Sequence, residues 1–406
     1  MTPASQGAAN APITQFDVIV LGAGPAGSAA ARTAAAAGLR VALVDKRRFP
    51  REKLCGGGFT GRSMRYYREI FGNDRPDAPI LSRDAVTFCV FGTLMGTYRD
   101  VPQLHMTMRT TLDQALLQRA LDAGATDFTG VRVRDIDPSG PSVTLDAITL
   151  TAPLLIGADG VNSATARALF GQAFNHNRIG FALEVEHPQD GPADSPVRID
   201  FGAADWGYGW DFPKTCGRTI GVGGVMHKNA DMKVALRRYL DRLGLPDNRP
   251  VKGQFLPFGD YRRKPGRGPV LLAGDAAGLV DPITGEGIAY AMKSGQLAAQ
   301  AAIASLAAGN PESALLRYRT GLIPVHQSIT QARLIRPFLF APAFRDGFTA
   351  GFRQSRSLRR DYMRLLAGET EYDEITRKTM ARVPSMIWRA ATGAILRKQN
   401  VAPPAT

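Results

Sequence analysis

The strongest constraint on the fold of this chain is the order of structural signals between residues 17 and 45. An apolar run, DVIVL at 17–21, leads into the glycine turn GAGPAG at 22–27 and then into an alanine-rich stretch that ends at Gly38. A second apolar run, VALVD, follows at 41–45. Buried parallel strands are short apolar runs, and alanine favours helix. The segment therefore predicts a strand, a helix and a second parallel strand.

The glycines and the terminal acid of this unit predict a dinucleotide site. Gly22 permits the tight turn, Gly24 lets a pyrophosphate approach the backbone, and Gly27 allows helix and strand to pack closely. The pyrophosphate would lie on the helix N-terminus, and Asp45 would accept hydrogen bonds from ribose hydroxyls. The alternative is a purely structural turn. This unit alone does not distinguish FAD from NAD. The expected cofactor contacts also include Pro25, Ala26 and Lys46.

Two later segments favour a flavin. The first has a strand at 153–156, then GADG at 157–160 with Asp159, then a helix. The second has the strand PVLLA at 269–273, Gly274 and Asp275, and a loop rich in glycine before another helix. Asp275 is expected to bind a ribityl hydroxyl, and the backbone at 285–288 is expected to face the flavin pyrimidine, where charge gathers on reduction. The expected contacts of this loop are Pro282, Gly285, Gly287 and Ile288.

These three segments, in this order, resemble the flavin motifs of the para-hydroxybenzoate-hydroxylase-like flavoproteins, over about residues 15–310. Two more stretches resemble signatures of the geranylgeranyl reductase family. One is FPREKLCGGG at 49–58, and the other is YGWDFP at 208–213, followed after seven residues by Gly221-Val222-Gly223. The loop from Gly274 to Ile288 also matches the pattern of that family.

The resemblance implies an α/β fold with a Rossmann-like FAD-binding domain interrupted by a sheet-rich substrate domain. We expect residues 15–75, 105–170 and 265–310 in the first domain, 76–104 and 171–264 in the second, and a helical region at 311–406. It also implies an FAD-dependent reductase that saturates C=C bonds of a geranylgeranyl-type polyprenyl lipid. The electron donor would be NADPH, NADH or ferredoxin. The alternatives are a monooxygenase or a halogenase on the same fold, and a flavin-binding protein without turnover.

The substrate residues are expected on a strand and on the loop that contains Cys55. Tyr208, Trp210 and Phe212 alternate and should share one face, either as ordinary core or as the roof of an apolar cavity above the flavin. Cys55 is either a buried small hydrophobe or a proton donor beside the flavin. The remaining expected contacts are Gly57, Pro213, Gly221 and Gly223 with the substrate, and Cys55, Gly56 and the phosphate-binding Arg109 with FAD.

Charge and composition restrict the partners. The net charge is +14, and residues 331–400 carry 14 Lys or Arg against 6 Asp or Glu. Without a nucleic-acid motif we expect no nucleic-acid partner, and a basic amphipathic helix over 386–398 would contact an anionic membrane or pack on the protein. Three cysteines and five dispersed histidines predict neither a disulfide scaffold nor a metal site. We expect a cytoplasmic protein, monomeric or weakly associated, with a short disordered lead at 1–15.

Overall fold

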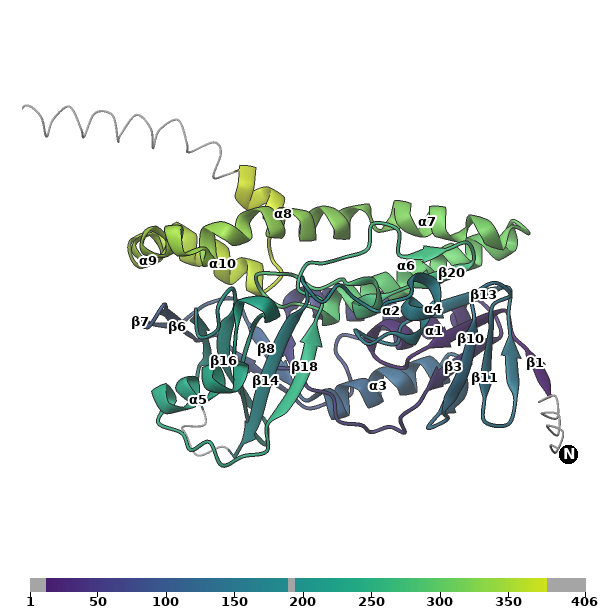
Figure 1. Cartoon of the computed structure of the whole chain (residues 1–406), viewed down its shortest axis with the longest axis horizontal. Coiled ribbons are helices and arrows are strands. Elements are labelled where there is room, and N and C mark those ends of the chain that lie inside the picture. Colours follow the sequence, from purple (N-terminus) through teal and green to yellow (C-terminus); the bar gives the residue numbers. More distant parts are fainter. Residues whose placement is uncertain (1–11, 189–193, 378–406) are drawn as a thin grey trace, which may run out of the picture.

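The computed structural model describes residues 12–188 and 194–377 of the chain. Two groups of strands lie side by side beneath a layer of helices (Figure 1). No helix in the described ranges is long and apolar enough to cross a bilayer. The predicted α/β class with a helical C-terminal region is confirmed, whereas the predicted helix at 386–398 lies outside the described residues.

The first group is built on a six-stranded sheet of order β19-β20-β13-β2-β3-β9. All its pairings are parallel except that of β19 with β20. The β2 and β13 residues are fully buried, as expected for a sheet covered on both faces. The strands are β2 (Val18–Leu21), β3 (Val41–Asp45), β9 (Thr126–Thr129), β13 (Leu154–Gly157), β19 (Gly266–Arg267) and β20 (Val270–Leu272).

Small residues bring the helices of this group close together. A Cβ at Gly295 would lie 2.0 Å from the carbonyl oxygen of Ala26, so the helices α1 and α6 touch backbone to backbone at this point. The helices of this group are α1 (Pro25–Ala36), α3 (Arg109–Asp122), α4 (Ala164–Phe170) and α6 (Ile288–Ala307), with the 3-10 turns η2 (Gly274–Ala277) and η3 (Pro311–Ser313).

A four-stranded sheet of order β1-β12-β11-β10 completes this side of the molecule. Its strands are β1 (Ile13–Gln15), β10 (Val133–Asp137), β11 (Ser142–Leu145) and β12 (Thr149–Thr151). The prediction of a disordered lead through residue 15 was wrong for residues 13–15. These residues are exposed, and their backbone pairs in parallel with the free edge of β12, a partner that the local sequence does not show.

The second group is a seven-stranded sheet of order β18-β14-β17-β16-β15-β6-β7. Leu183, Val185, Ile220 and Val222 on one face pack against α5 (Met232–Leu243). The strands are β6 (Val86–Val90), β7 (Thr93–Tyr98), β14 (Gly180–His187), β15 (Val197–Phe201), β16 (Tyr208–Lys214), β17 (Gly217–Val225) and β18 (Lys252–Leu256), with the turn η1 (Met226–Lys228). All seven fall within the ranges assigned to the substrate domain, although the domain boundaries themselves stay a prediction.

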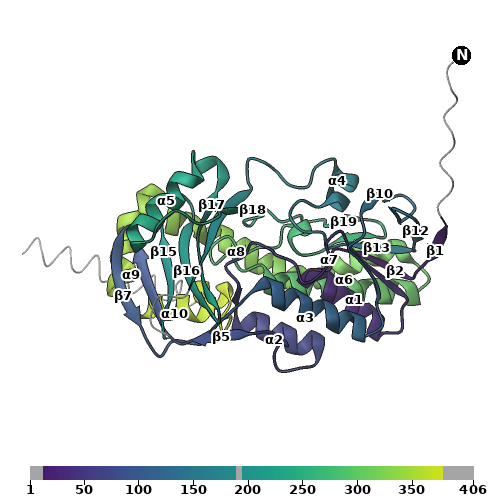
Figure 2. The same cartoon turned by 90° about the horizontal axis from the view of Figure 1, so that it is seen from below.

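A small three-stranded sheet joins the two groups, with β4 (Gly58–Phe59), β8 (Leu104–Thr107) and β5 (Ile80–Arg83) beside α2 (Gly61–Phe71). The helical layer above both groups is seen edge-on in Figure 1 and from below in Figure 2. It contains α7 (Ala314–Gly321), α8 (Ile323–Phe340), η4 (Pro342–Phe344), α9 (Arg345–Gln354) and α10 (Arg356–Leu366).

Candidate flavin site

Two glycines of the turn before α1, Gly22 and Gly27, have no room for a side chain. Gly22 has a φ of 96°, and a Cβ on it would lie 2.3 Å from the carbonyl oxygen of Ala158 at the end of β13. A Cβ on Gly27 would lie 1.6 Å from the carbonyl oxygen of Gly22. Gly24 caps the helix and Pro25 begins it. A bare turn at a helix N-terminus suits a pyrophosphate, because the first N–H groups of a helix have no intrahelical acceptor.

Asp45 holds this turn against the end of β3. One carboxylate oxygen accepts from the backbone N–H of Ala23 at 2.9 Å, and the other accepts from that of Arg47 at 2.8 Å. The neighbouring Lys46 is exposed. Asp45 is thus at the predicted position, half-buried beside the turn, and each oxygen keeps a lone pair for a hydroxyl.

The arginine beside the glycine turn is Arg51, which we did not assign as a cofactor ligand. Its Nη2 lies 3.4 Å from the position of a Cβ on Gly24, and 3.1 Å from the buried Asp113. The predicted phosphate ligand, Arg109, makes a bidentate pair with the same Asp113 at 2.6 and 2.8 Å. Burial lowers the pKa of Arg109, but Asp113 outweighs it and raises that pKa overall. The role of Arg109 at the phosphates stays a prediction.

Asp159, predicted to bind the cofactor, is engaged locally. Its carboxylate accepts from the hydroxyl of Ser163 at 2.5 Å, and from the N–H and hydroxyl of Thr165 at 3.0 and 3.2 Å. Ser163 is the N-cap of α4. The side chain of Asp159 therefore fixes the start of α4, while its backbone lies against Gly22. A direct contact with FAD stays a prediction.

The third segment lies at the start of α6. The Asp275 carboxylate is 3.7 Å from the position of a Cβ on Gly287, so Asp275 faces the helix N-terminus across a glycine. The loop between them is shaped by the fully buried Asp281, which accepts from the N–H groups of Ile283 and Thr284 at 2.7 and 2.9 Å. Pro282 packs on Gly259, where a Cβ would meet its ring at 2.8 Å.

Glu286 connects this loop to two distant parts of the chain. It accepts from Thr60 and from the fully buried Arg62, both at the start of α2. Arg62 also contacts Glu371, close to the end of the described chain, at 3.0 Å. Burial raises the pKa of Glu286, and Arg62 opposes this rise. We had not assigned Arg62 or Glu286, because the ion pairs depend on contacts more than 200 residues apart in the chain.

Tyr208, Trp210 and Phe212 share one face of β16, as the alternation predicted. Pro213, which was expected to contact the substrate with them, lies on the other face of the strand, because successive side chains of a strand alternate. Register places Trp210 opposite Gly221 of β17, and Gly221 opposite Glu184 of β14. A Cβ on Gly221 would lie 2.4 Å from the Trp210 indole, and one on Gly223 would lie 3.4 Å from it. These two glycines therefore make space for the indole ring.

The aromatic face lies between two cofactor segments. The Tyr208 hydroxyl donates to the carbonyl of Thr284 at 2.7 Å, next to Gly285. At the other end, a Cβ on Gly56 would meet Trp210 and Phe212 at 3.1 Å. Gly57 has a φ of 70° and packs against the backbone of Thr107. The structure thus brings together Gly56, Trp210, Phe212 and the 284–285 loop, and their contact with a substrate stays a prediction.

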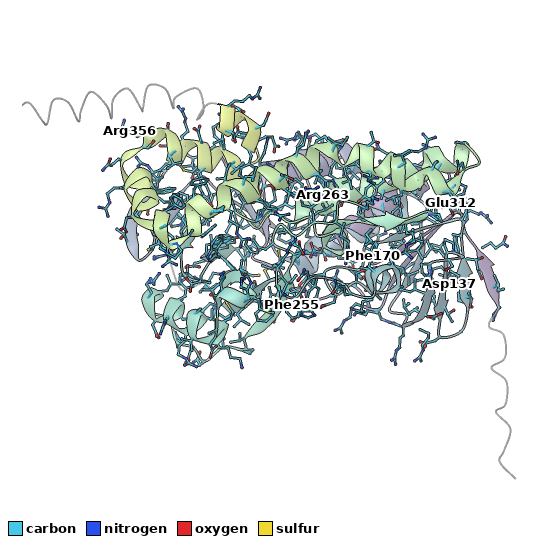
Figure 3. All side chains as sticks on the ribbon, turned by 45° about the horizontal axis from the view of Figure 1, so that its top comes forward. Asp137, Phe170, Phe255, Arg263, Glu312 and Arg356 are labelled. Atoms are coloured by element: carbon cyan, nitrogen blue, oxygen red, sulfur yellow. The ribbon has the colours of Figure 1, made fainter. Side chains whose placement is uncertain are left out.

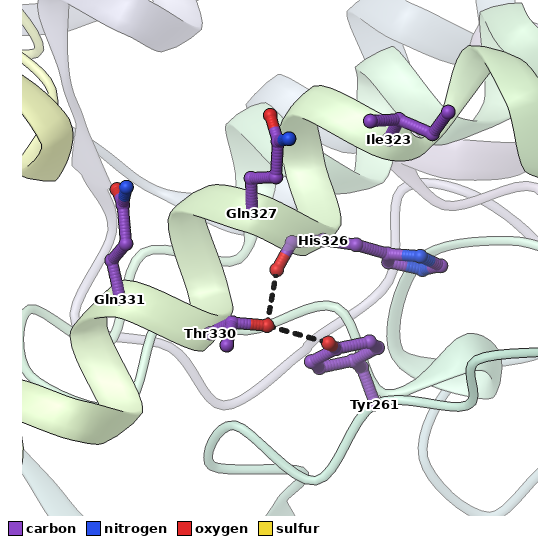
Figure 4. A pocket seen from close by; sticks show the side chains of 6 residues that line it. All are labelled: Tyr261, Ile323, His326, Gln327, Thr330 and Gln331. Atoms are coloured by element: carbon purple, nitrogen blue, oxygen red, sulfur yellow. Dashed lines mark hydrogen bonds between the residues drawn. The ribbon is translucent and has the colours of Figure 1, made fainter.

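A separate surface pocket of about 430 Å³ lies between the Tyr261 loop and α8 (Figure 4). The Tyr261 and Thr330 hydroxyls are 2.6 Å apart, and the His326 ring stacks on Tyr261. Burial lowers the pKa of His326 to about 4, helped by Arg319 and Arg263. None of the six lining residues belongs to the predicted flavin or substrate set.

In the described ranges, no group of three or more His, Cys, Asp or Glu side chains could hold a metal ion.

The bare glycine turn, the acid ending β3 and the Asp275–Gly287 approach fit a bound FAD, and together they define an FAD-binding oxidoreductase. The profile of the FAD binding domain matches residues 15–185. Menaquinone reductase of Mycolicibacterium smegmatis is 34% identical over 316 residues, which cover 71% of this chain and 76% of that protein. Geranylgeranyl diphosphate reductase of Rhodobacter capsulatus is 32% identical, covering 78% and 82%.

A solved structure described as geranylgeranyl bacteriochlorophyll reductase-like, from Thermoplasma acidophilum, superposes with a TM-score of 0.75. It is 20% identical and covers 91% of this chain and 99% of its own, so it supports the fold. The chain belongs to the geranylgeranyl reductase-like family of FAD-dependent oxidoreductases.

Proposed function

We propose that this enzyme saturates C=C bonds of a geranylgeranyl-type polyprenyl lipid, with hydride supplied by the bound, reduced FAD. The observation that carries the proposal is the aromatic face of β16 against the Cys55–Gly57 segment. Gly221 and Gly223 seat the Trp210 indole there, and Tyr208 and Phe212 flank it. Aromatic rings present a large apolar area with little loss of conformational entropy, which suits the methyl-branched, uncharged chain of an isoprenoid.

In this reaction the protein positions the alkene of the substrate and excludes water from it. Trp210 and Phe212 would hold the alkene in place, and the adjacent Cys55 is the candidate for delivering a proton to the carbon that does not take hydride. The similarity to a geranylgeranyl diphosphate reductase and to a menaquinone reductase supports a prenyl-chain substrate. We further propose NADPH, NADH or ferredoxin as electron donor. The second GxGxxG match in the sequence, at 56–61, runs through the Cys55 loop and β4 and does not follow a buried parallel strand, so it does not predict a separate nicotinamide domain.

An anaerobic single-turnover experiment tests the proposal. Chemically reduced holoenzyme is mixed with geranylgeranyl diphosphate or menaquinone, and flavin absorbance and product mass are followed. We expect flavin reoxidation with a product two hydrogens heavier per double bond. Trp210→Phe should slow this step about tenfold or more, whereas Trp206→Phe, on the loop before β16, should not. A flavin that stays reduced until oxygen enters, with a product that gains oxygen, would replace the reductase by the monooxygenase alternative.

We also propose peripheral contact with an anionic membrane at the cytoplasmic face, by a monomer or weak oligomer. The support is a row of exposed apolar side chains on the outer helical layer, at Leu316, Ile323, Leu334, Phe338 and Phe344. From 323 to 366 this layer carries eight arginines and two acids. Figure 3 looks onto it and labels Arg356 there. Apolar side chains among arginines suit an anionic lipid surface.

A further inference from the structure

Two buried ionisable side chains hold the segment that contains Cys55. The Glu184 carboxylate accepts from the backbone N–H of Cys55 at 3.1 Å. The Lys214 ammonium donates to the carbonyl of Gly56. Each side chain is 2% exposed. Neither residue belongs to the flavin motifs.

The second carboxylate oxygen of Glu184 has no hydrogen-bond partner among the described residues. An unpaired oxygen on a buried carboxylate is costly, because desolvation is not offset by a donor. Glu184 lies on the same sheet face as Trp210, separated from it in register only by Gly221. A Cβ at Gly221 would be 2.4 Å from the indole, so the ring covers the space beside Glu184. The unpaired carboxylate oxygen of Glu184 therefore lies on the same side of the sheet as Tyr208, Trp210 and Phe212.

Both groups titrate close to neutrality. Burial raises the pKa of Glu184 to about 7, against the opposing effects of the Cys55 N–H and of Lys214. Burial lowers the pKa of Lys214 to about 8, although the nearby Cys55 and Glu184 act to raise it. A group whose pKa is close to the working pH can accept or release a proton at little free-energy cost.

The charged surroundings of this pair come from several elements. Glu186 on the same strand also raises the pKa of Glu184, and Lys252 on β18 lowers it. Glu186 and Cys216 also act to raise the pKa of Lys214.

The Cys55 side chain interacts with Lys53 on its own loop and with Lys214 on β16. It also interacts with Arg109 on α3 and with Tyr208 on β16. Its sulfur accepts from the N–H of Gly57 at 3.4 Å. Cys55 therefore lies among several cations, and the buried carboxylate of Glu184 holds its backbone.

We propose that Glu184 and Lys214 are a proton-holding pair that positions Cys55 and returns the proton which Cys55 gives up during reduction of the double bond. The inference rests on the proposed function. When one alkene carbon takes hydride, the S–H bond of Cys55 breaks and its proton forms the C–H bond at the other carbon. The thiolate then takes a proton from the pair, and water refills the pair. Glu184 and Lys214 act through Cys55, so both are positioning residues.

Peptide-resolved alkylation of Cys55 in the holoenzyme tests the pair without any lipid substrate. Glu184→Gln removes a negative charge that exists only above about pH 7, so Cys55 should react about tenfold faster there and unchanged at lower pH. Lys214→Met removes a positive charge that exists below about pH 8, so Cys55 should react about tenfold more slowly there. Glu186→Gln, on the same face but half-exposed and paired with Lys252, is the matched control.

The single-turnover rate gives the second measurement, with flavin absorbance reporting that each variant is folded and loaded. Because Glu184 holds the backbone of Cys55 before the thiol gives up its proton, Glu184→Gln should lower the single-turnover rate about tenfold or more and remove the pH inflection near 7. Glu186→Gln should keep both the rate and the inflection. Alkylation and rate profiles of Glu184→Gln and Lys214→Met that match Glu186→Gln would overturn the pair while leaving the reductase intact. Absence of a saturated product from the wild-type enzyme would overturn the proposed function and the proton return together, and alkylation would still decide the positioning of Cys55.

Discussion

At the scale of single residues, glycines determine where other groups can be. Gly221 and Gly223 are both opposite aromatic residues of β16, yet they differ in the space around them. A Cβ at Gly221 would be 2.4 Å from Trp210 and 2.6 Å from the carbonyl of Leu183, whereas at Gly223 every neighbour would be at 3.4 Å or more. The first glycine is therefore required for the position of the indole, and the second only leaves it room.

This difference predicts the outcome of two alanine substitutions. Gly221→Ala should displace the Trp210 ring, reduce the free energy of unfolding by about 1–3 kcal/mol and lower the turnover rate. Gly223→Ala should leave stability within about 1 kcal/mol, because its methyl group makes ordinary contacts. Urea denaturation and tryptophan fluorescence measure both effects. Equal losses in the two variants would show that the indole is not seated on Gly221.

At the scale of elements, α8 has two different faces. Val325, Ile329 and Ala332 are buried against the protein, while Leu334 and Phe338 are 68% and 58% exposed. Single exposed apolar residues are common, but here the Phe338 ring also contacts the exposed Phe344 at 5.0 Å between centroids. The outer face of this layer is therefore an apolar row with arginines beside it.

Vesicle cosedimentation tests the outer face of α8. The wild-type protein should bind vesicles that contain phosphatidylglycerol better than neutral ones, and salt should weaken the binding. Leu334→Ser with Phe338→Ser should reduce the affinity about tenfold or more, because each side chain loses apolar burial in the lipid. Ile13→Ser, which changes an exposed apolar residue on β1 at the other end of the molecule (Figure 1), should have no effect. Binding that ignores lipid charge and salt would refute the electrostatic contact.

At the scale of the whole molecule, the buried carboxylate of Glu184 makes stability depend on pH. Its pKa is raised from 4.5 to about 7 in the folded protein. Well below pH 4.5 the group is protonated in both the folded and the unfolded chain and has no effect on stability. Between pH 4.5 and about pH 7 the carboxyl is ionised in the unfolded chain but still protonated in the folded protein. The folded state therefore loses stability as the pH rises through this range, by up to about 3 kcal/mol.

Glu184→Gln should therefore stabilise the protein at about pH 8, by up to about 3 kcal/mol, and much less at about pH 5. Loss of the charge that faces Lys214 will reduce this gain. Urea unfolding of the two proteins at both pH values measures it. A gain of equal size at both pH values would assign the effect to packing. The same variant is expected to be slower in turnover, which is a common exchange of function for stability at active sites.

The sequence alone determined the strands and helices of the flavin motifs and the shared face of Tyr208, Trp210 and Phe212, because glycine turns and period-two alternation are local properties. It also indicated the family. Only the tertiary structure showed Arg51 at the glycine turn, Arg62 between Glu286 and Glu371, and Glu184 and Lys214 on the Cys55 segment. Each of these contacts joins residues far apart in the chain. Their burial and charge depend on how the sheets pack, which no local pattern contains.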